Sequence, residues 1–400
     1  MELSLDMYQT VALAVIFYFL GCYIRKNVSF FSKFCIPAPV IGGLIFALIN
    51  LGLRTSGVLV LNLTDTLQSV FMTVFFCSIG FTASFRLLKK GGVQVFIFLA
   101  VAIVLVVLQN VLAVLLAGVF NLDPLLGLCT GSIPMVGGHG TAGSFGPLFE
   151  NDLGVLGANT VAIASATFGL IGGSLIGGPI ANRLIVKRGL KPVCNQYSEQ
   201  EETVLEEVLP EVHEVDTDRF MNAIAILFIA MGIGSIVYNF FKSINLTFPT
   251  YIGAMLIGAL IRNVCDLKKM SLPEREIEVC GSVGLSVFLA MALMSLRLWE
   301  LAALALPLVV MLLAQTLLMA VYATFVTFNV MGRDYEAAVL AAANCGFGMG
   351  ATPNAMANMQ SVSSKFGPAP KAFFIVPLVG SLFIDFFNSG ILTIFINVLH

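Results

Sequence analysis

The chain has 400 residues, of which 58% are hydrophobic and only 11% are charged, with a formal net charge of −2 and a mean hydropathy of +0.95. This composition excludes an ordinary soluble domain, in which about 45–50% of residues are apolar, and a basic nucleic-acid-binding protein, so no nucleic-acid partner is expected. The eight cysteines form no Cys-x-x-Cys pair. Neither a disulfide framework, a zinc-type metal site nor a cofactor is therefore indicated.

Long apolar segments dominate the chain. A helix needs about 20 mostly apolar residues to cross the hydrocarbon core of a bilayer. The segments that qualify are 8–24, 38–53, 66–85, 93–119, 158–182, 219–241, 248–264, 278–298, 301–330 and 372–397. The first should remain in the protein, because Glu2 and Asp6 stand where a signal peptide carries basic residues. The sequence thus predicts an all-α polytopic membrane protein with ten transmembrane helices.

The basic residues set the expected orientation, because Lys and Arg are enriched in cytoplasmic loops. With these ten spans, every Lys and Arg except Arg54, Lys242 and Arg297 falls on one side. Both termini are therefore expected outside, in the periplasm, and the 183–218 connection in the cytoplasm. Arg297 could clamp a substrate carboxylate, but beside Trp299 at a span end it is more typical of a side chain that reaches the membrane interface.

The two halves of the chain carry the same landmarks in the same order. These are a Pro-led span, a Val-Phe pair, a glutamine and a glycine-rich break: Pro39, Val74-Phe75, Gln109 and Gly131–Thr141 in the first half, and Pro249, Val287-Phe288, Gln315 and Cys345–Asn354 in the second. Five spans in each half would give the halves opposite orientations. We expect two inverted repeats, 1–182 and 219–400, joined by the acidic connection 183–218, which is typical of a solvated tether.

The glycine-rich breaks lie in segments that are too apolar for the protein surface, while the distribution of charged residues does not allow additional pairs of membrane crossings there. Segments 121–157 and 335–370 are each predicted to form a re-entrant helical hairpin, one entering from each side. Leu125–Val136 would be an inward arm of the first hairpin, with Gly137–Gly140 as its tip, and Thr352–Asn354 would lie near the tip of the second. Irregular backbone is tolerated at membrane depth only where protein or a watery cavity satisfies it. The two tips are expected to meet near the midplane and to form a binding site.

The residues of these tips favour an anionic substrate bound by backbone. Glycines allow close approach of peptide N–H groups, and the N-termini of half-helices carry partial positive charge that stabilises carboxylates. The predicted substrate-binding residues are Gly137, Gly138, His139, Gly140, Thr141, Gly350, Thr352, Pro353 and Asn354. His139 is alternatively a donor that only braces the tip.

Oxygen-bearing groups near the breaks favour a hard cation such as sodium. The predicted sodium ligands are Ser132, Ser165, Thr167, Gly346, Asp385 and Asn388. Asp385 is the main carboxylate within a span, although it could instead bridge two helices. The hydroxyls of Ser165 and Thr167 could instead bond to carbonyls of their own helix. The small residues Gly169, Gly173 and Gly177 favour close helix packing over ligand approach.

Several of these motifs together resemble the bacterial sodium/glutamate symporter family. They are Gly137–Thr141, Ser286–Met294, Trp299–Ala302, Cys345–Gly348 and Ala355–Gln360. The resemblance implies sodium-coupled uptake of L-glutamate across the bacterial inner membrane. It also implies a fold similar to the 2-hydroxycarboxylate transporters and a homodimer, in which a mobile core moves like an elevator against a dimerising scaffold. This chain departs from some members at Pro134 and Val136, where they carry hydroxyl side chains.

Other classes of function remain open from the residues alone. A sodium-coupled dicarboxylate symporter is the nearest alternative, because backbone that binds carboxylates does not by itself recognise an α-amino group. A cation/proton antiporter would need a cluster of titratable groups, and Asp385 with His139 is a small one. A channel would need rings of ligands from several subunits. An enzyme is not expected, because no metal-ligand spacing or paired carboxylates lie in the spans.

Overall fold

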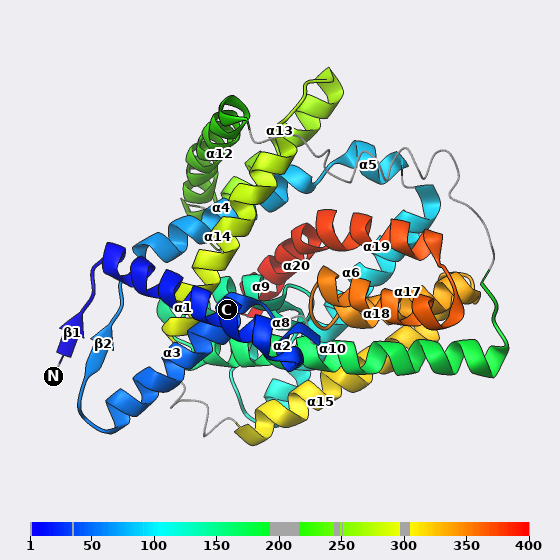
Figure 1. Ribbon diagram of the computed structural model, residues 1–400, viewed down its shortest axis with the longest axis horizontal. Helices are drawn as coiled ribbons and strands as arrows, with labels where there is room; N and C mark the ends of the chain where they lie inside the picture. The colour runs from blue at the N-terminus through cyan, green and yellow to red at the C-terminus, as the bar shows by residue number, and fades with distance from the viewer. Residues whose placement is uncertain are drawn as a thin grey trace.

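The computed structural model describes residues 2–33, 36–90, 92–192, 216–243, 249, 251–296 and 305–399 (Figure 1). Residues 193–215 of the acidic connection, Arg297 and the Trp299–Ala302 motif lie outside the described residues.

The first half of the chain is almost entirely helical. Its elements are β1 (Glu2–Ser4), α1 (Met7–Asn27), α2 (Ser29–Lys33), α3 (Ala38–Thr55), β2 (Val60–Asn62), α4 (Thr66–Thr82), α5 (Phe85–Lys90), α6 (Gly92–Val119), α7 (Pro124–Leu128), α8 (Ser132–Met135), α9 (Gly138–Pro147), the π-helical turn η1 (Leu148–Asp152) and α10 (Ala158–Arg188). α1 begins at a capping box, in which Asp6 and Gln9 each bond the other's backbone N–H. α10 ends at Gly189, whose φ of +62° suits glycine.

The second half of the chain is also almost entirely helical. Its elements are α12 (Thr217–Ser243), α13 (Tyr251–Lys268), α14 (Glu274–Met294), α15 (Ala305–Tyr322), the π-helical turn η4 (Ala323–Thr327), α16 (Phe328–Val330), α17 (Tyr335–Phe347), α18 (Thr352–Phe366), α19 (Pro370–Leu382) and α20 (Ile384–Leu399).

By length and composition, seven of the described helical segments can cross a membrane, or eight if α19 and α20, bent by 44° at their junction, count as one span. The protein is therefore a helical polytopic membrane protein. Two further predicted spans correspond to α4, with 17 residues, and α13, with 18.

A small β-sheet departs from the all-α prediction. Strands β1 and β2 pair in parallel, with Glu2 opposite Val60. The Thr64 hydroxyl donates to the Leu5 carbonyl at 2.7 Å, and the Leu5 N–H donates to the Asn62 carbonyl at 2.9 Å. Three-residue strands are too short for a period-two pattern to be recognised in sequence.

The described helices pack in two groups (Figure 1). The first group contains α1, α3, α4, α12, α13 and α14. The second contains α6 to α10 and α15 to α20, and its main apolar core joins α6, α17 and α19. Contacts between the groups run mainly from α9 to α14. A second apolar cluster, which includes Phe145 of α9 and Phe288 of α14, is continuous across this boundary.

Close helix crossings in the first group depend on glycine. A Cβ atom added at Gly21 of α1 would collide with backbone of α3, and one added at Gly234 of α12 would collide with backbone of α13. The two crossings lie at corresponding places in the two halves of the sequence.

Both predicted tips differ in detail from the structure. α9 already begins at Gly138, so the first break is centred on Val136–Gly137, and α18 begins at Thr352, so the second break is Gly348–Ala351. The arm predicted as one helix over Leu125–Val136 is instead two short helices, α7 and α8. The interruption is stabilised by a polar side chain from α6, described below.

Candidate functional site

The two broken segments touch each other through backbone. Gly138 has φ of +57°, in the left-handed region that favours glycine. A Cβ atom added there would lie 2.8 Å from the carbonyl oxygen of Gly350 in the second break. Residues some 210 positions apart in sequence therefore meet at one place. The carbonyl of Gly350 leaves no room for a side chain at Gly138.

Ser132 anchors the first break between α6 and α20. Its backbone N–H donates to Asn110 Oδ1 at 2.9 Å, and its hydroxyl donates to Asn388 Oδ1 at 2.7 Å. The Asn388 amide returns a hydrogen bond to the Ser132 carbonyl at 3.3 Å. All three side chains are fully buried. Because Asn110 satisfies the N–H that the interruption exposes, the arm can break at Cys129–Gly131 inside an apolar environment.

His139 lies at the start of α9 and contacts α10. Its Nε2 is 3.0 Å from the Thr167 hydroxyl, which donates to the Ile163 carbonyl one turn earlier at 3.1 Å. Since the Thr167 proton is used within its own helix, the network assigns the donor role in the contact to His139 Nε2–H. His139 thus braces the tip, one of the two roles expected from sequence, and Thr167 makes the in-helix bond that was the alternative to sodium ligation.

The second break is held by amide side chains. Gln109 Nε2 of α6 donates to the Gly348 carbonyl at 2.7 Å, and Gln315 Nε2 of α15 donates to the Gln109 carbonyl at 2.9 Å. On α18, Asn354 Nδ2 donates to the Leu170 carbonyl at 2.8 Å. These bonds fix the second tip against α6 and α10.

The glycine stripe on α10 serves close packing, as predicted. A Cβ atom at Gly173 would lie 2.6 Å from the carbonyl oxygen of Cys345, and one at Gly177 would lie 2.9 Å from that of Ala342. Gly346 has a similar role inside the second hairpin. A Cβ there would lie 2.5 Å from the backbone of Ala355, and its carbonyl accepts the Ala351 N–H at 3.2 Å.

Several buried polar atoms near the breaks have no hydrogen-bond partner. They include Ser165 Oγ of α10, Asn354 Oδ1 of α18, Ser389 Oγ of α20 and the Tyr251 hydroxyl of α13. An unpaired buried acceptor costs about 1–3 kcal/mol, so such a group is typical of a site that a ligand completes. These oxygens suit a hard cation or an ammonium group.

The predicted site residues differ in accessibility. Gly138, His139, Thr141, Gly350 and Asn354 are buried, Gly137, Gly140 and Thr352 are half-buried, and Pro353 is exposed. Among the predicted sodium ligands, Ser132, Ser165 and Asn388 are buried, whereas Asp385 is half-buried in the first turn of α20. The described hydrogen bonds connect Ser132 to Asn388 and Thr167 to His139, while Gly346 packs within the second hairpin. These hydrogen bonds therefore do not link all six predicted sodium ligands into one network.

Sequence reasoning missed two participants. Asn110 was not considered, although Gln109-Asn110 is a polar pair in the middle of the most apolar helix, α6, and this isolation was the available signal. The second is Tyr251, an aromatic residue near the start of the predicted span 248–264. It is fully buried and stacks on Phe76 at 3.7 Å between ring centroids.

The sequence of this chain matches a known protein family. Residues 3–368 match the family model described as sodium/glutamate symporter. The chain is 42% identical over 394 residues to the sodium/glutamate symporter of Escherichia coli (strain K12), covering 98% of each chain. It is 39% identical over 403 residues to that of Haemophilus influenzae, covering 100% of this chain and 99% of the relative. The chain therefore belongs to the sodium/glutamate symporter family.

Proposed function

We propose that this protein takes up L-glutamate together with sodium ions, and that the contact between the two broken segments is the binding site. The observation that carries the proposal is the approach of Gly138 to the Gly350 carbonyl, and it is supported by the buried oxygens without partners on α10, α13, α18 and α20. Membership of the family and the names of its relatives in Escherichia coli and Haemophilus influenzae support the choice of substrate and coupling ion.

The substrate carboxylates bind at the start of the half-helices α9 and α18. Both helices begin at a break, so their first N–H groups and partial positive charge are available to an anion. Gly137 to Thr141 in the first segment, and Gly350 with Thr352 to Asn354 in the second, provide this backbone. The substrate ammonium group needs an acceptor, and the unpaired Asn354 Oδ1 supplies one. Asp385 is a further candidate acceptor for this group.

Sodium ions bind to oxygens beside the tips. Ser165 Oγ is buried without a partner, and the Ser132–Asn388 pair presents side-chain and carbonyl oxygens at the first break. Asp385 provides the negative charge that favours a cation, and among the described residues no basic side chain forms an ion pair with it. Thr167 and the Gly346 carbonyl are weaker candidates because each already makes a hydrogen bond within its own segment.

An inverted repeat of 1–182 and 219–400 is supported by matching contacts in the two halves. His139 at the start of α9 contacts Thr167 of α10. Thr352 and Gly380 follow these two residues at the same offset, and a Cβ at Gly380 would lie 2.9 Å from Thr352 Oγ1. The glycine crossings at Gly21 and Gly234 correspond in the same way. These pairs favour ten crossings with α7 to α9 and α17 to α18 as re-entrant hairpins.

Transport follows an elevator-like movement of the second helix group against the first. The boundary favours sliding, because Gly140 and Gly143 of α9 face Phe75 of α4 and Phe288 of α14 without large side chains of their own. The first group forms the scaffold of a homodimer in the inner membrane, with the termini in the periplasm. Each net positive charge moved inward gains about 2.3 kcal/mol per 100 mV, so more than one sodium per glutamate monoanion makes uptake electrically driven.

The test is uptake of labelled L-glutamate into proteoliposomes with an inward sodium gradient, compared with potassium alone and with citrate as competitor. We expect uptake that requires sodium, rises with a negative-inside potential and is not reduced by citrate. Uptake that proceeds equally without sodium would refute the coupling, and competition by citrate would indicate a dicarboxylate symporter instead.

A further inference from the structure

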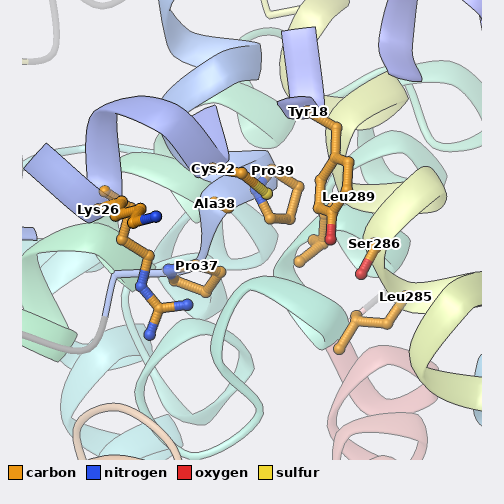
Figure 2. A pocket seen from close by; sticks show the side chains of 10 residues that line it. Tyr18, Cys22, Lys26, Pro37, Ala38, Pro39, Leu285, Ser286 and Leu289 are labelled. Atoms are coloured by element: carbon orange, nitrogen blue, oxygen red, sulfur yellow. The ribbon is translucent and has the colours of Figure 1, made fainter. Parts of the chain in front are cut away.

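A pocket of about 440 Å³ lies between the end of α1, the start of α3 and the middle of α14 (Figure 2). The side chains that matter to its chemistry are Tyr18, Arg25 and Lys26 of α1 and Leu285 and Ser286 of α14. Figure 2 shows the hydroxyls of Tyr18 and Ser286 on one side of the pocket and Lys26 on the other. No predicted substrate-binding or sodium-binding residue lines it.

The pocket attracts anions. Among the described residues that line it, Arg25 and Lys26 are the charged ones, both are exposed, and none is a carboxylate. Two adjacent cations at the wall of a concave, partly apolar surface raise the local concentration of an anion more than the same charges on a flat surface.

The pocket can also accept an ammonium group. The Ser286 hydroxyl donates to the Ser282 carbonyl at 2.9 Å, so its lone pairs remain available as acceptors. The Tyr18 hydroxyl lies on the same side of the pocket as the Ser286 hydroxyl (Figure 2). Two cations on one side and hydroxyl oxygens on the other match a molecule with two carboxylates and one ammonium group.

The pocket adjoins the first broken segment. Leu285, part of its wall, approaches Gly140 of α9, where an added Cβ would lie 3.7 Å from Leu285 Cδ1. Gly140 is half-buried and is two residues from Gly138, which meets the second break. A ligand in the pocket is thus separated from the tip region by one side chain.

We infer that this pocket is a peripheral site for the amino dicarboxylate substrate, occupied from the side of the membrane on which Arg25 and Lys26 lie. This inference rests on the proposed function and adds a second binding position to it. The bias of basic residues assigns that side to the cytoplasm. The pocket then holds glutamate between the tips and the cytoplasm. Its affinity contributes to the KM for glutamate that enters the binding site from the cytoplasmic face.

The decisive experiment compares glutamate exchange from the two faces, using right-side-out and inverted membrane vesicles. The double variant R25Q/K26Q removes both charges of the pocket. The matched control is K268Q/K269Q, which removes two adjacent exposed cations from the predicted cytoplasmic end of α13. Size-exclusion chromatography and expression level establish that each variant folds.

We expect R25Q/K26Q to raise KM for glutamate on the cytoplasmic face on the order of tenfold at low ionic strength, with much less effect at high ionic strength, because salt screens exposed charges. KM on the opposite face and both values for the control should stay near wild type. An unchanged KM, or an equal rise on both faces, would overturn the inference while leaving wild-type sodium-dependent uptake intact. Absence of wild-type uptake would instead refute the proposed function, and the inference with it.

An anionic phospholipid headgroup has the same charge and is the main competing occupant. The exchange measurement is therefore repeated in proteoliposomes of neutral lipid alone and of neutral lipid with anionic phospholipid. The effect of R25Q/K26Q should be present in both. If it appears only when anionic lipid is present, the pocket binds lipid and the inference is wrong.

Discussion

Replacing Gly173 by alanine tests how α10 supports the second hairpin. Gly173 is buried, and its added Cβ would lie 2.6 Å from the Cys345 carbonyl oxygen and 3.2 Å from the Met349 Cβ. The first of these neighbours is backbone, which cannot rotate away. The methyl group must therefore move α10 and α17 apart, in the region where Asn358 and Asn354 bond to α10 carbonyls.

The magnitude follows from two opposing terms. Overpacking by one methyl group in a dense core costs about 1–3 kcal/mol, whereas alanine in a helix is favoured over glycine by roughly 0.5–1 kcal/mol. Gly178 on the same helix isolates the second term, because an added Cβ there has no neighbour within 4 Å. Gly173→Ala should therefore be less stable than Gly178→Ala by about 1–3 kcal/mol.

The assay is unfolding of the purified variants by denaturant titration in mixed micelles, followed by sodium-driven glutamate uptake per folded molecule. Gly178→Ala should be as stable as wild type or slightly more stable, with normal uptake. Gly173→Ala should unfold earlier and transport more slowly, because the second tip loses its support. Equal stability of the two variants would refute the argument from close packing.

Three further predictions concern the site. Asn388→Ala leaves the Ser132 hydroxyl without its buried partner and should raise the sodium concentration for half-maximal uptake on the order of tenfold, whereas Asn397→Ala on the same helix should not. Tyr251→Phe should raise the free energy of unfolding by up to about 1–3 kcal/mol, because it removes a buried hydroxyl that has no hydrogen-bond partner. Tyr251→Ala, which also removes ring stacking, should cost about 3–5 kcal/mol in denaturant titration. His139→Ala and Thr167→Val should show a coupling of about 0.5–1.5 kcal/mol in a double-mutant cycle of stability.

Each of these has a clear contrary result. Equal sodium dependence in the two asparagine variants would remove Asn388 from the sodium site. A large loss of stability in Tyr251→Phe would mean that its hydroxyl is satisfied by a group such as Ser144 or Ser389. Additive effects of the His139 and Thr167 substitutions would mean that their contact does not stabilise the tip.

The positions of the long helices could be predicted because apolar length alone identifies a membrane span. The site was only partly predictable. Glycines and polar residues marked both breaks, since lipid tolerates them only for a reason. The interruption of the first arm at Cys129–Gly131 was not predicted, because the residue that stabilises it, Asn110, comes from a different helix that only the tertiary fold brings close. Likewise Asn388 and Ser132 were both predicted as sodium ligands, but their hydrogen bond could not be predicted, because only the tertiary fold brings them close.

The approach of Gly138 to the Gly350 carbonyl limits how this protein can change during evolution. Backbone groups at the centre of the proposed site are the same for every sequence, so substitution there cannot adjust the choice of ligand. It can only abolish the contact, since not even a methyl group fits at Gly138. A new substrate preference must therefore arise in the surrounding side chains, such as Thr352 and Asn354, or along the route by which the ligand arrives. Carboxylate recognition would persist while the rest of the ligand changes.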